Sequence, residues 1–389
     1  MSGIYIHIPF CKQACYYCDF HFSTSLKRKD EMVQTLVKEL LLRKEELQNK
    51  IVETIYFGGG TPSLLSIDEI RLLMDTIHQN YKLVKNPEIT LEANPDDLMS
   101  VRAESRTIFE DYLDLGINRL SIGIQSFFDD DLKAMNRAHT SKEAKNCLSA
   151  AIGSFDNITI DLIYGIPTMS NEQWRENLQM AFEFEVNHIS SYALTVEPKT
   201  ALASFIKKGK YPPIDEDKAL GHFNILIEEI EKHGFIHYEI SNFGKPNYFS
   251  EHNTSYWLGK SYLGIGPSAH SYNGMHRSWN VSNNMKYMKA IQANLLPQEI
   301  EKLSIKDRFN EYIMTGLRTI WGVSLLEIER DFGVVYKNHL LKNCKNFIDR
   351  GLLEIVTSSD GESNCTEKLK TTKKGKFLVD GIASEMFMI

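Results

Sequence analysis

The sequence predicts an α/β protein: a partial (β/α)6 barrel followed by a smaller, mostly helical domain with a winged-helix-like hairpin. Short β-branched or aromatic runs alternate with amphipathic helical patterns six times within about the first 195 residues. This alternation is typical of a parallel sheet with right-handed crossovers. Six units are too few for a closed eight-stranded barrel. Polar residues and glycines gather at the predicted strand ends, where the β/α loops of such a barrel form its functional rim.

The predicted barrel strands are short hydrophobic runs. They span Ile4–Ile8, Thr54–Phe57, Glu88–Glu92, Arg119–Ile124, Ile158–Tyr164 and His188–Thr195. The helices between them carry apolar residues at helical spacing, and Ser66 is the expected N-cap of the second. They span Asp30–Gln48, Ile67–Gln79, Glu104–Leu115, Ser141–Ala151 and Glu172–Phe184.

The pattern changes after Pro198. We expect a helix over Asp215–His233, a strand over Tyr238–Ile240, and a loop rich in Gly, Asn and aromatic residues over Ser241–Asn280. In the C-terminal region we expect three helices, at Asp307–Arg318, Leu325–Phe332 and Lys337–Arg350. We also expect a hairpin of Leu352–Val356 with Leu369–Thr371, followed by a mostly helical segment over Lys376–Phe387. We therefore expect a barrel over residues 1–200, a barrel extension over 201–300 and a C-terminal domain over 301–389.

Composition excludes several classes of function. The 389 residues include 51 acidic and 44 basic ones, a net charge of −7, which argues against a nucleic-acid binder. No apolar run reaches membrane-spanning length, and the N-terminus lacks the basic and apolar parts of a secretory signal. We expect a cytoplasmic protein with reduced thiols. The sequence leaves open whether it is a monomer or a dimer.

Three cysteines near the N-terminus, Cys11, Cys15 and Cys18, have CxxxCxxC spacing. Three thiolates are one ligand fewer than a closed tetrahedral site needs, and an open position is typical of a catalytic metal. Thiolates also hold iron–sulfur clusters. On spacing alone, zinc with His7 or His21 as a fourth ligand remains an alternative. The other cysteines are scattered and predicted to be plain buried or half-buried thiols; they are Cys147, Cys344 and Cys365.

The triplet, with an aromatic residue before its last cysteine, resembles the cluster loop of the radical S-adenosylmethionine (SAM) superfamily. Gly58-Gly59-Gly60-Thr61-Pro62, which follows the second predicted strand, resembles that superfamily's second motif. The resemblance implies a 4Fe-4S cluster whose open iron is chelated by SAM, and a protein that donates electrons to the cluster. An electron from the cluster then cleaves the sulfonium to give a 5′-deoxyadenosyl radical. The features downstream of the triplet thus favour a cluster over zinc.

Further motifs resemble the oxygen-independent coproporphyrinogen III oxidase-like family, across the barrel and into the C-terminal domain. These motifs are Tyr5–Cys11, Phe57–Pro62, Glu92–Pro95, Ser121–Phe127, Asn136-Arg137 and Asp161–Pro167. The resemblance implies that Tyr5 and Tyr17 flank the cluster and SAM, and that Arg137 opposes a carboxylate. It implies a SAM site made of Tyr5, Tyr17, Gly59, Gly60, Thr61, Glu92, Gln125, Arg137, Asp161, and Ala193 or Leu194 at the adenine.

Two features depart from the oxidase branch: Phe20 stands where that branch has a further cysteine, and Tyr5 lies almost at the start of the chain. Instead, His252-Asn253-Thr254-Ser255-Tyr256-Trp257 resembles the HNxxYW signature of a heme-chaperone branch. The resemblance implies that His252 ligates heme iron, oriented by Asn253, while Tyr256 and Trp257 line the macrocycle. A lone histidine is more often a surface or packing residue. His270 and His276 are weaker candidates.

The sequence therefore predicts a heme chaperone on a radical SAM scaffold, which passes heme to an acceptor apoprotein of the respiratory chain and contacts the membrane peripherally. The alternative is a radical oxidative decarboxylase of porphyrin biosynthesis. A third interpretation is a radical SAM enzyme with an unrelated substrate. The sequence assigns no catalytic residue, and it leaves open whether heme is bound covalently and whether SAM is cleaved.

Overall fold

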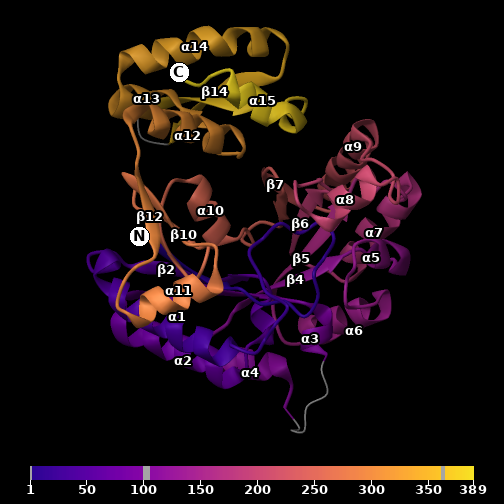
Figure 1. The fold of residues 1–389 in the computed structure, drawn as a ribbon. Helices are drawn as coiled ribbons and strands as arrows, with labels where there is room; N and C mark the ends of the chain where they lie inside the picture. The colour runs from indigo at the N-terminus through magenta and orange to yellow at the C-terminus, as the bar shows by residue number, and fades with distance from the viewer. Residues whose placement is uncertain (1, 100–105, 361–363) are drawn as a thin grey trace.

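A computed structural model describes residues 2–99, 106–360 and 364–389. Its main feature is one curved sheet of twelve strands in the order β12-β11-β10-β9-β1-β2-β3-β4-β5-β6-β8-β7 (Figure 1). The six strands predicted for the barrel are all present, adjacent and parallel. They are β1 (Ser2–Ile8), β2 (Val52–Gly59), β3 (Leu83–Ala93), β4 (Arg119–Gln125), β5 (Asn157–Tyr164) and β6 (His188–Ala193). The predicted partial barrel is confirmed.

Side chains alternate across these strands, so the two faces of the sheet differ in chemistry. The outer face is apolar and buried, as shown by Ile4 and Ile6 of β1 and by Leu120 and Ile122 of β4. The inner face is unusually polar. Its residues are Tyr5, His7, Thr54, Tyr56, Glu88, Thr90, Glu92, Arg119, Ser121, Thr159, Asp161, His188 and Ser190. Because a barrel interior normally fills with apolar side chains, this polar lining indicates an interior that has a functional role in addition to packing.

Helices cover the outer face of the sheet (Figure 1). They are α1 (Lys29–Arg43), η1 (Lys44–Leu47), η2 (Pro62–Leu64), α2 (Ile67–Asn80), α3 (Pro95–Leu98), α4 (Ile108–Asp114), α5 (Asp129–Ala134), α6 (Ser141–Ile152), α7 (Asn171–Glu183), α8 (Ala201–Lys207) and α9 (Glu216–Lys232). Ser66 caps α2 through a capping box, as predicted. The helix predicted from Glu104 begins later, at Ile108, because Thr107 caps it; Glu104 itself lies outside the described residues.

The loop predicted over Ser241–Asn280 is wrong. This segment contains β8 (Asn242–Gly244), α10 (Glu251–Trp257), β9 (Ser261–Ile265), β10 (His270–Tyr272) and β11 (His276–Asn280). β9 pairs in parallel with β1. Beyond β9, that edge of the sheet continues with β10, β11 and β12 (Gln298–Lys302), and the other edge continues from β6 with β8 and β7 (Ile236–Glu239). Strands of three to five residues and a helix of seven are too short to show a clear period in sequence.

The C-terminal domain has its own hydrophobic core, built around Phe309, Leu325 and Leu369. After α11 (Asn284–Gln292) and β12, it consists of α12 (Ile305–Leu317), β13 (Val323–Ser324), α13 (Leu325–Phe332), α14 (Val334–Asp349), β14 (Leu353–Asp360), β15 (Asn364–Thr371), η3 (Lys376–Leu378) and α15 (Val379–Ser384). β14 and β15 form the predicted hairpin. The division of the chain at residues 200 and 300 stays a prediction.

The C-terminal domain spans the opening of the partial barrel (Figure 1). At one sheet edge the backbone N–H of Ile320 donates to the carbonyl of Tyr238 at 2.9 Å. At the other edge Arg277 of β11 forms an ion pair with Glu311 of α12. The sheet is therefore open in its hydrogen bonding, but a second domain covers the gap.

Candidate functional site

The three cysteines follow β1 and lie on a loop held from two directions. The N–H of Cys11 donates to the carbonyl of Ser23 at 3.1 Å, and the Cys11 thiol is hydrogen-bonded to Thr61, which follows β2. The Arg137 guanidinium reaches Cys15, with Nη1 3.4 Å from Sγ. All three thiols are partly exposed, so the loop presents them to the barrel rim. The sequence prediction of a shared thiol site is consistent with this placement.

The surroundings of Cys11 and Cys18 favour the protonated thiol when no metal is bound. Burial raises the pKa of Cys11, against the opposing effects of the Thr61 hydrogen bond and of Arg137. Burial also raises the pKa of Cys18 to about 11. Metal binding needs thiolates, so cluster assembly here must release protons.

The histidines considered as zinc ligands are occupied elsewhere. His7 Nε2 lies 2.8 Å from the carbonyl of His21, and His21 Nε2 lies 2.7 Å from Asn284 Oδ1. In residues 2–99, 106–360 and 364–389, no three His, Cys, Asp or Glu side chains converge as the ligands of one metal ion.

Gly59 and Gly60 bring the end of β2 against β1. A Cβ on Gly60 would lie 2.5 Å from the carbonyl oxygen of Phe10, and Gly59 has φ +106° with the His7 ring 2.5 Å from its would-be Cβ. The Gly60 N–H donates to the carbonyl of Ile8 at 2.9 Å. These glycines therefore allow the end of β2 to pack closely against the strand that precedes the cysteines. This packing role is additional to the close approach of a ligand that the motif implies.

Two carboxylates, Glu92 and Asp161, face the polar interior and are half-buried. Glu92 accepts hydrogen bonds from Tyr56 Oη at 2.7 Å and from the N–H of Gly59 at 3.2 Å. Burial raises the pKa of Glu92 to about 7 and that of Asp161 to about 6. Both suit the role of acceptors for the ammonium or hydroxyl groups of a bound ligand.

Arg137 links the strand ends to the cysteine loop. Its Nη2 donates to Asn94 Oδ1 at 2.6 Å and to the carbonyl of Gly123 at 2.9 Å, while its Nε is buried without a partner. Asn94 Nδ2 in turn donates to Thr61 Oγ1 at 3.2 Å. An orphaned guanidinium N–H beside the thiols fits a carboxylate-bearing ligand.

The remaining predicted SAM residues differ in placement. Gln125 ends β4 with φ +66°, beside Gly123 and Arg137. Burial raises the pKa of Tyr17, which lies close enough to Arg137, Cys15 and Asp161 to interact with them electrostatically. Ala193 ends β6 and packs against the hydrophobic core, so its side chain is the least suited of the set to contact a ligand, and the adenine contact stays a prediction.

His252 lies on α10, inside the barrel and near the N-terminal ends of the strands. Its ring is buried, with Nδ1 2.7 Å from Thr54 Oγ1 and Nε2 2.7 Å from Tyr256 Oη. The ring stacks on Tyr56, with centroids 4.9 Å apart, and more loosely on Tyr5. Burial lowers the pKa of His252 to about 3, so the ring is neutral. Both ring nitrogens are engaged in this conformation.

A polar layer holds α10 in place. Glu88 accepts hydrogen bonds from the N–H groups of His252 and Glu251, both at 2.9 Å, and Tyr238 Oη accepts from the N–H of Ser250 at 3.3 Å. His188 Nε2 lies 2.7 Å from the same Tyr238 hydroxyl. None of these residues was predicted from the sequence to belong to a site, and neither were Tyr56, Asn94 and Ser190. The alternation of polar and apolar residues along the strands was the pattern that indicates them.

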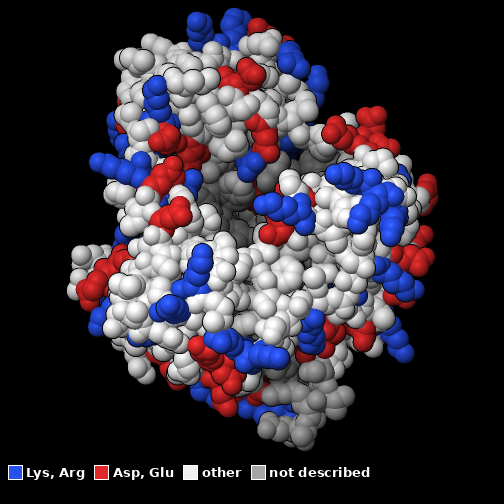
Figure 2. Space-filling model, in the orientation of Figure 1, with Lys and Arg blue, Asp and Glu red and all other residues white. Residues whose placement is uncertain are grey.

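A cleft of about 1110 Å³ lies between α10, the adjoining strands and the C-terminal domain. Tyr256 and Trp257 line it together with Asn253, whereas His252 lies behind Tyr256. The prediction that Asn253 orients the His252 ring is wrong, because Thr54 and Tyr256 are the partners of its two nitrogens. Figure 2 shows the molecule hollowed where the C-terminal domain meets the barrel.

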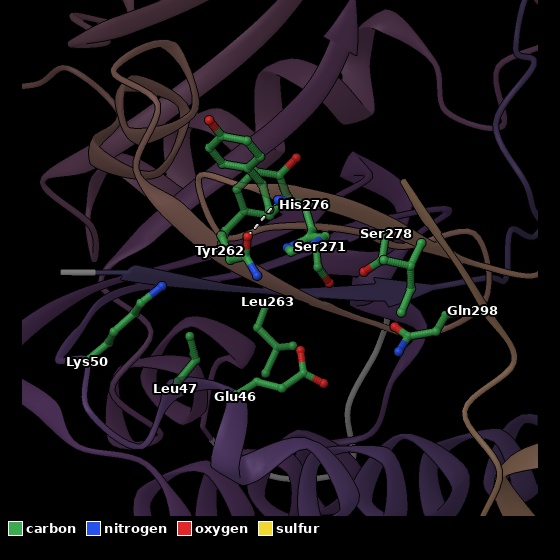
Figure 3. Close-up of a pocket in the computed structure, with 12 residues that line it drawn as sticks. Glu46, Leu47, Lys50, Tyr262, Leu263, Ser271, His276, Ser278 and Gln298 are labelled. Carbon is green, nitrogen blue, oxygen red and sulfur yellow. Dashed lines mark hydrogen bonds between the residues drawn. The ribbon is translucent and has the colours of Figure 1, made fainter. Parts of the chain in front are cut away.

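His276, a weaker heme candidate, lies elsewhere. With Glu46, Lys50 and Ser278, among others, it lines a separate pocket of about 370 Å³ over η1 (Figure 3). The backbone N–H of His276 donates to Asn273 Oδ1 at 2.8 Å. His270 is exposed and stacks on Trp279, with ring centroids 5.9 Å apart. Neither side chain lines the cleft.

Comparison with known proteins agrees with this geometry. Residues 5–181 match the radical SAM superfamily, and residues 303–358 match the HemN C-terminal domain. The solved structure of coproporphyrinogen III oxidase (HemN) from Escherichia coli, a radical SAM enzyme, shares the fold with a TM-score of 0.82 at 22% identity, covering 99% of this chain and 90% of that one. The chain is therefore a member of the radical SAM superfamily.

Within that superfamily the relatives are more specific. The protein named heme chaperone HemW from Bacillus subtilis is 32% identical over 385 residues, with 97% of both chains covered. HemW from Escherichia coli is 38% identical over 274 residues, covering 69% of each chain. The chain belongs to the HemW family.

The superfamily implies a 4Fe-4S cluster and SAM, and the residues fit both groups. Cys11, Cys15 and Cys18 would hold the cluster, and the orphaned Nε of Arg137 with the carboxylates of Glu92 and Asp161 would face SAM. Separately, no helix in the described parts of the chain is long and apolar enough to cross a membrane.

Proposed function

We propose that this protein is a heme chaperone that binds heme in the cleft beside α10 and delivers it to an acceptor apoprotein. The observation that carries the proposal is the cleft itself, which presents Tyr256 and Trp257 of the HNxxYW segment to a space of about 1110 Å³. Ligand pockets typically measure roughly 300–1,000 Å³, so this one is large enough for a tetrapyrrole. The names of the relatives support the same function.

The cleft has the chemistry that a flat, apolar macrocycle requires. Trp257 and Tyr256 lie on the barrel side, and Trp321 and Phe332 lie on the C-terminal domain. Aromatic side chains on two sides of a cleft offer large apolar area at fixed geometry. Heme would thus lie between the domains, where a change in their separation would release it.

We propose His252 as the axial ligand of the heme iron, with one condition set by the structure. Its Nε2 is hydrogen-bonded to Tyr256 Oη, so ligation requires Tyr256 to give up this contact. The neutral ring already has the protonation state that metal binding needs.

The SAM site lies at the opposite end of the barrel interior from α10. When bound, the cluster and SAM supply one-electron chemistry. The chain itself connects the two regions through Tyr56, which donates a hydrogen bond to Glu92 and also stacks on His252. This contact supports the proposal that cluster and SAM assist or regulate heme transfer. We place the protein in the cytoplasm, with a respiratory-chain acceptor at the membrane surface and a separate electron donor.

The test is a heme titration followed in the Soret band with the anaerobically reconstituted protein. His252→Ala should weaken binding by about tenfold or more and shift the band. Tyr256→Phe should strengthen binding, because it frees Nε2 without removing the ring. His233→Ala, an exposed histidine on the end of α9, is the matched control and should behave as wild type.

Two outcomes would contradict the proposal. Unchanged binding in His252→Ala would remove this residue as a ligand. Robust turnover of coproporphyrinogen III with SAM and reductant would favour the decarboxylase of porphyrin biosynthesis instead.

A further inference from the structure

The wall of the cleft contains a guanidinium with no partner. Arg308 lies in the first turn of α12 and lines the cleft. Within the described residues its guanidinium makes no hydrogen bond or ion pair, and its Nε atom is inaccessible to water. A buried, unpaired donor of a charged group is costly, so such a group calls for a water, an ion or a ligand as its partner.

The neighbouring charged side chains on this wall have partners other than Arg308. Arg330 donates to Asp331 through Nε and Nη2, both at 2.7 Å. Glu311 is paired with Arg277 through Oε1, while its Oε2 is buried without a hydrogen-bond partner, and Glu327 accepts from Tyr312 Oη at 2.5 Å. Among the described residues Arg308 bonds none of these carboxylates, although its charge acts through space on Asp331.

One other cation on the wall, Lys368 of β15, also lacks an ion-pair partner among the described residues. Arg308 is the better placed of the two, because its charge acts on Tyr272 of β10 across the cleft. It therefore lies where the C-terminal domain faces the barrel, beside the aromatic walls. A planar guanidinium also binds a carboxylate in a bidentate manner, which an ammonium cannot do.

We propose that Arg308 binds a carboxylate of the tetrapyrrole and so fixes its orientation in the cleft. The inference rests on the proposed function and adds the group that recognises the ligand's polar edge. In this orientation the carboxylate edge points to α12, and the opposite part of the macrocycle points to Tyr256 and α10. The C-terminal domain then holds the ligand by its acidic groups while the barrel provides the axial side.

The test compares heme with heme dimethyl ester, in which both carboxylates are esterified and uncharged. Wild-type protein should bind heme about tenfold more tightly than the ester. R308Q should bind heme as weakly as wild type binds the ester, and its affinity for the ester should not change. Arg308→Lys should keep part of the preference. R350Q, which alters an exposed cation at the C-terminal end of α14 and outside the cleft lining, should keep all of it.

The outcomes separate the two proposals. If wild type and R308Q prefer heme to the ester equally, heme binding stands and the role of Arg308 falls. If wild type binds neither compound, the proposed function itself falls. If R308Q loses both compounds while its thermal unfolding is unchanged, Arg308 shapes the cleft and does not bind a carboxylate.

Discussion

At the scale of single residues, the glycines after β2 show how one motif serves packing and chemistry together. Sequence alone indicates a triple glycine after a strand, and the resemblance assigns it to a ligand. The structure adds that Gly60 lies against the backbone of Phe10 and Ile8. That contact joins residues about 50 positions apart, so no local pattern could predict it.

Gly60→Ala should therefore disturb the cysteine loop before it disturbs any ligand. The added methyl group would lie 2.5 Å from the Phe10 carbonyl oxygen, and backbone on both sides limits relief. We expect a loss of about 1–3 kcal/mol in the free energy of unfolding and less iron bound after reconstitution. Urea denaturation and iron analysis measure the two effects.

Gly221→Ala in α9 is the matched control, because nothing lies within 4 Å of its would-be Cβ. It should raise stability by up to about 1 kcal/mol through helix propensity. Equal behaviour of the two variants would contradict the packing role of Gly60.

His252 shows the limit of residue-level prediction at the site. The HNxxYW resemblance pointed to residues of α10, and Asn253, Tyr256 and Trp257 line the cleft. It could not show that both nitrogens of His252 are engaged, because Thr54 comes from a strand almost 200 residues earlier.

At the scale of elements, long periodic segments were predictable and short ones were not. The six barrel strands and helices such as α2 and α13 lie where their patterns place them. The segment over Ser241–Asn280 was taken for a loop because its strands and α10 are too short for periodicity. Their form depends on neighbours in the sheet and on contacts such as that between Glu88 and the start of α10.

One such contact joins α1 to the sheet extension. Glu39 of α1 is fully buried and accepts hydrogen bonds from the N–H of Gly266 at 2.8 Å, from Asn280 Nδ2 at 2.7 Å and from Tyr287 Oη at 2.5 Å. Its carboxylate also pairs with the buried Arg43 at 3.2 Å. One side chain thus fastens a helix of the barrel to β9, β11 and α11.

Glu39→Ala should destabilise the protein by about 3–5 kcal/mol, since it leaves the buried Arg43 charge with less compensation. Glu45→Ala, an exposed acid one and a half turns later, should change stability by less than about 0.5 kcal/mol. Thermal or urea unfolding of both variants measures the difference. A cost in Glu39→Ala as small as in the control would show that β9–β11 and α11 are held by packing alone.

At the scale of the whole molecule, the two candidate sites lie at opposite ends of the same parallel strands. The cysteines lie at the carboxyl ends of the parallel strands, and α10 lies near their amino ends, with the polar interior between them. The general rule that β/α loops carry function predicted only the first region. The second depends on a C-terminal domain that covers the barrel opening.

If heme binds in the cleft, hydrogen exchange should slow on both of its sides at once. We expect protection in α10 and in α12, because they belong to different domains and both line the cleft. Helix α2, on the outer face of the sheet, is the internal reference and should not change (Figure 1). Mass spectrometry with and without heme measures this, and protection confined to residues 11–18 would place heme at the cysteine loop instead.

The pairing of β9 with β1 also constrains how the protein is made. β1 is complete in the sheet only when Ser261–Ile265 have been synthesised, about 260 residues after β1 itself. Contacts of such long sequence separation form slowly and late. The edge of β1, the strand that precedes the cysteine loop, therefore stays uncovered until β9 is available, and the sheet around the loop is completed late in folding.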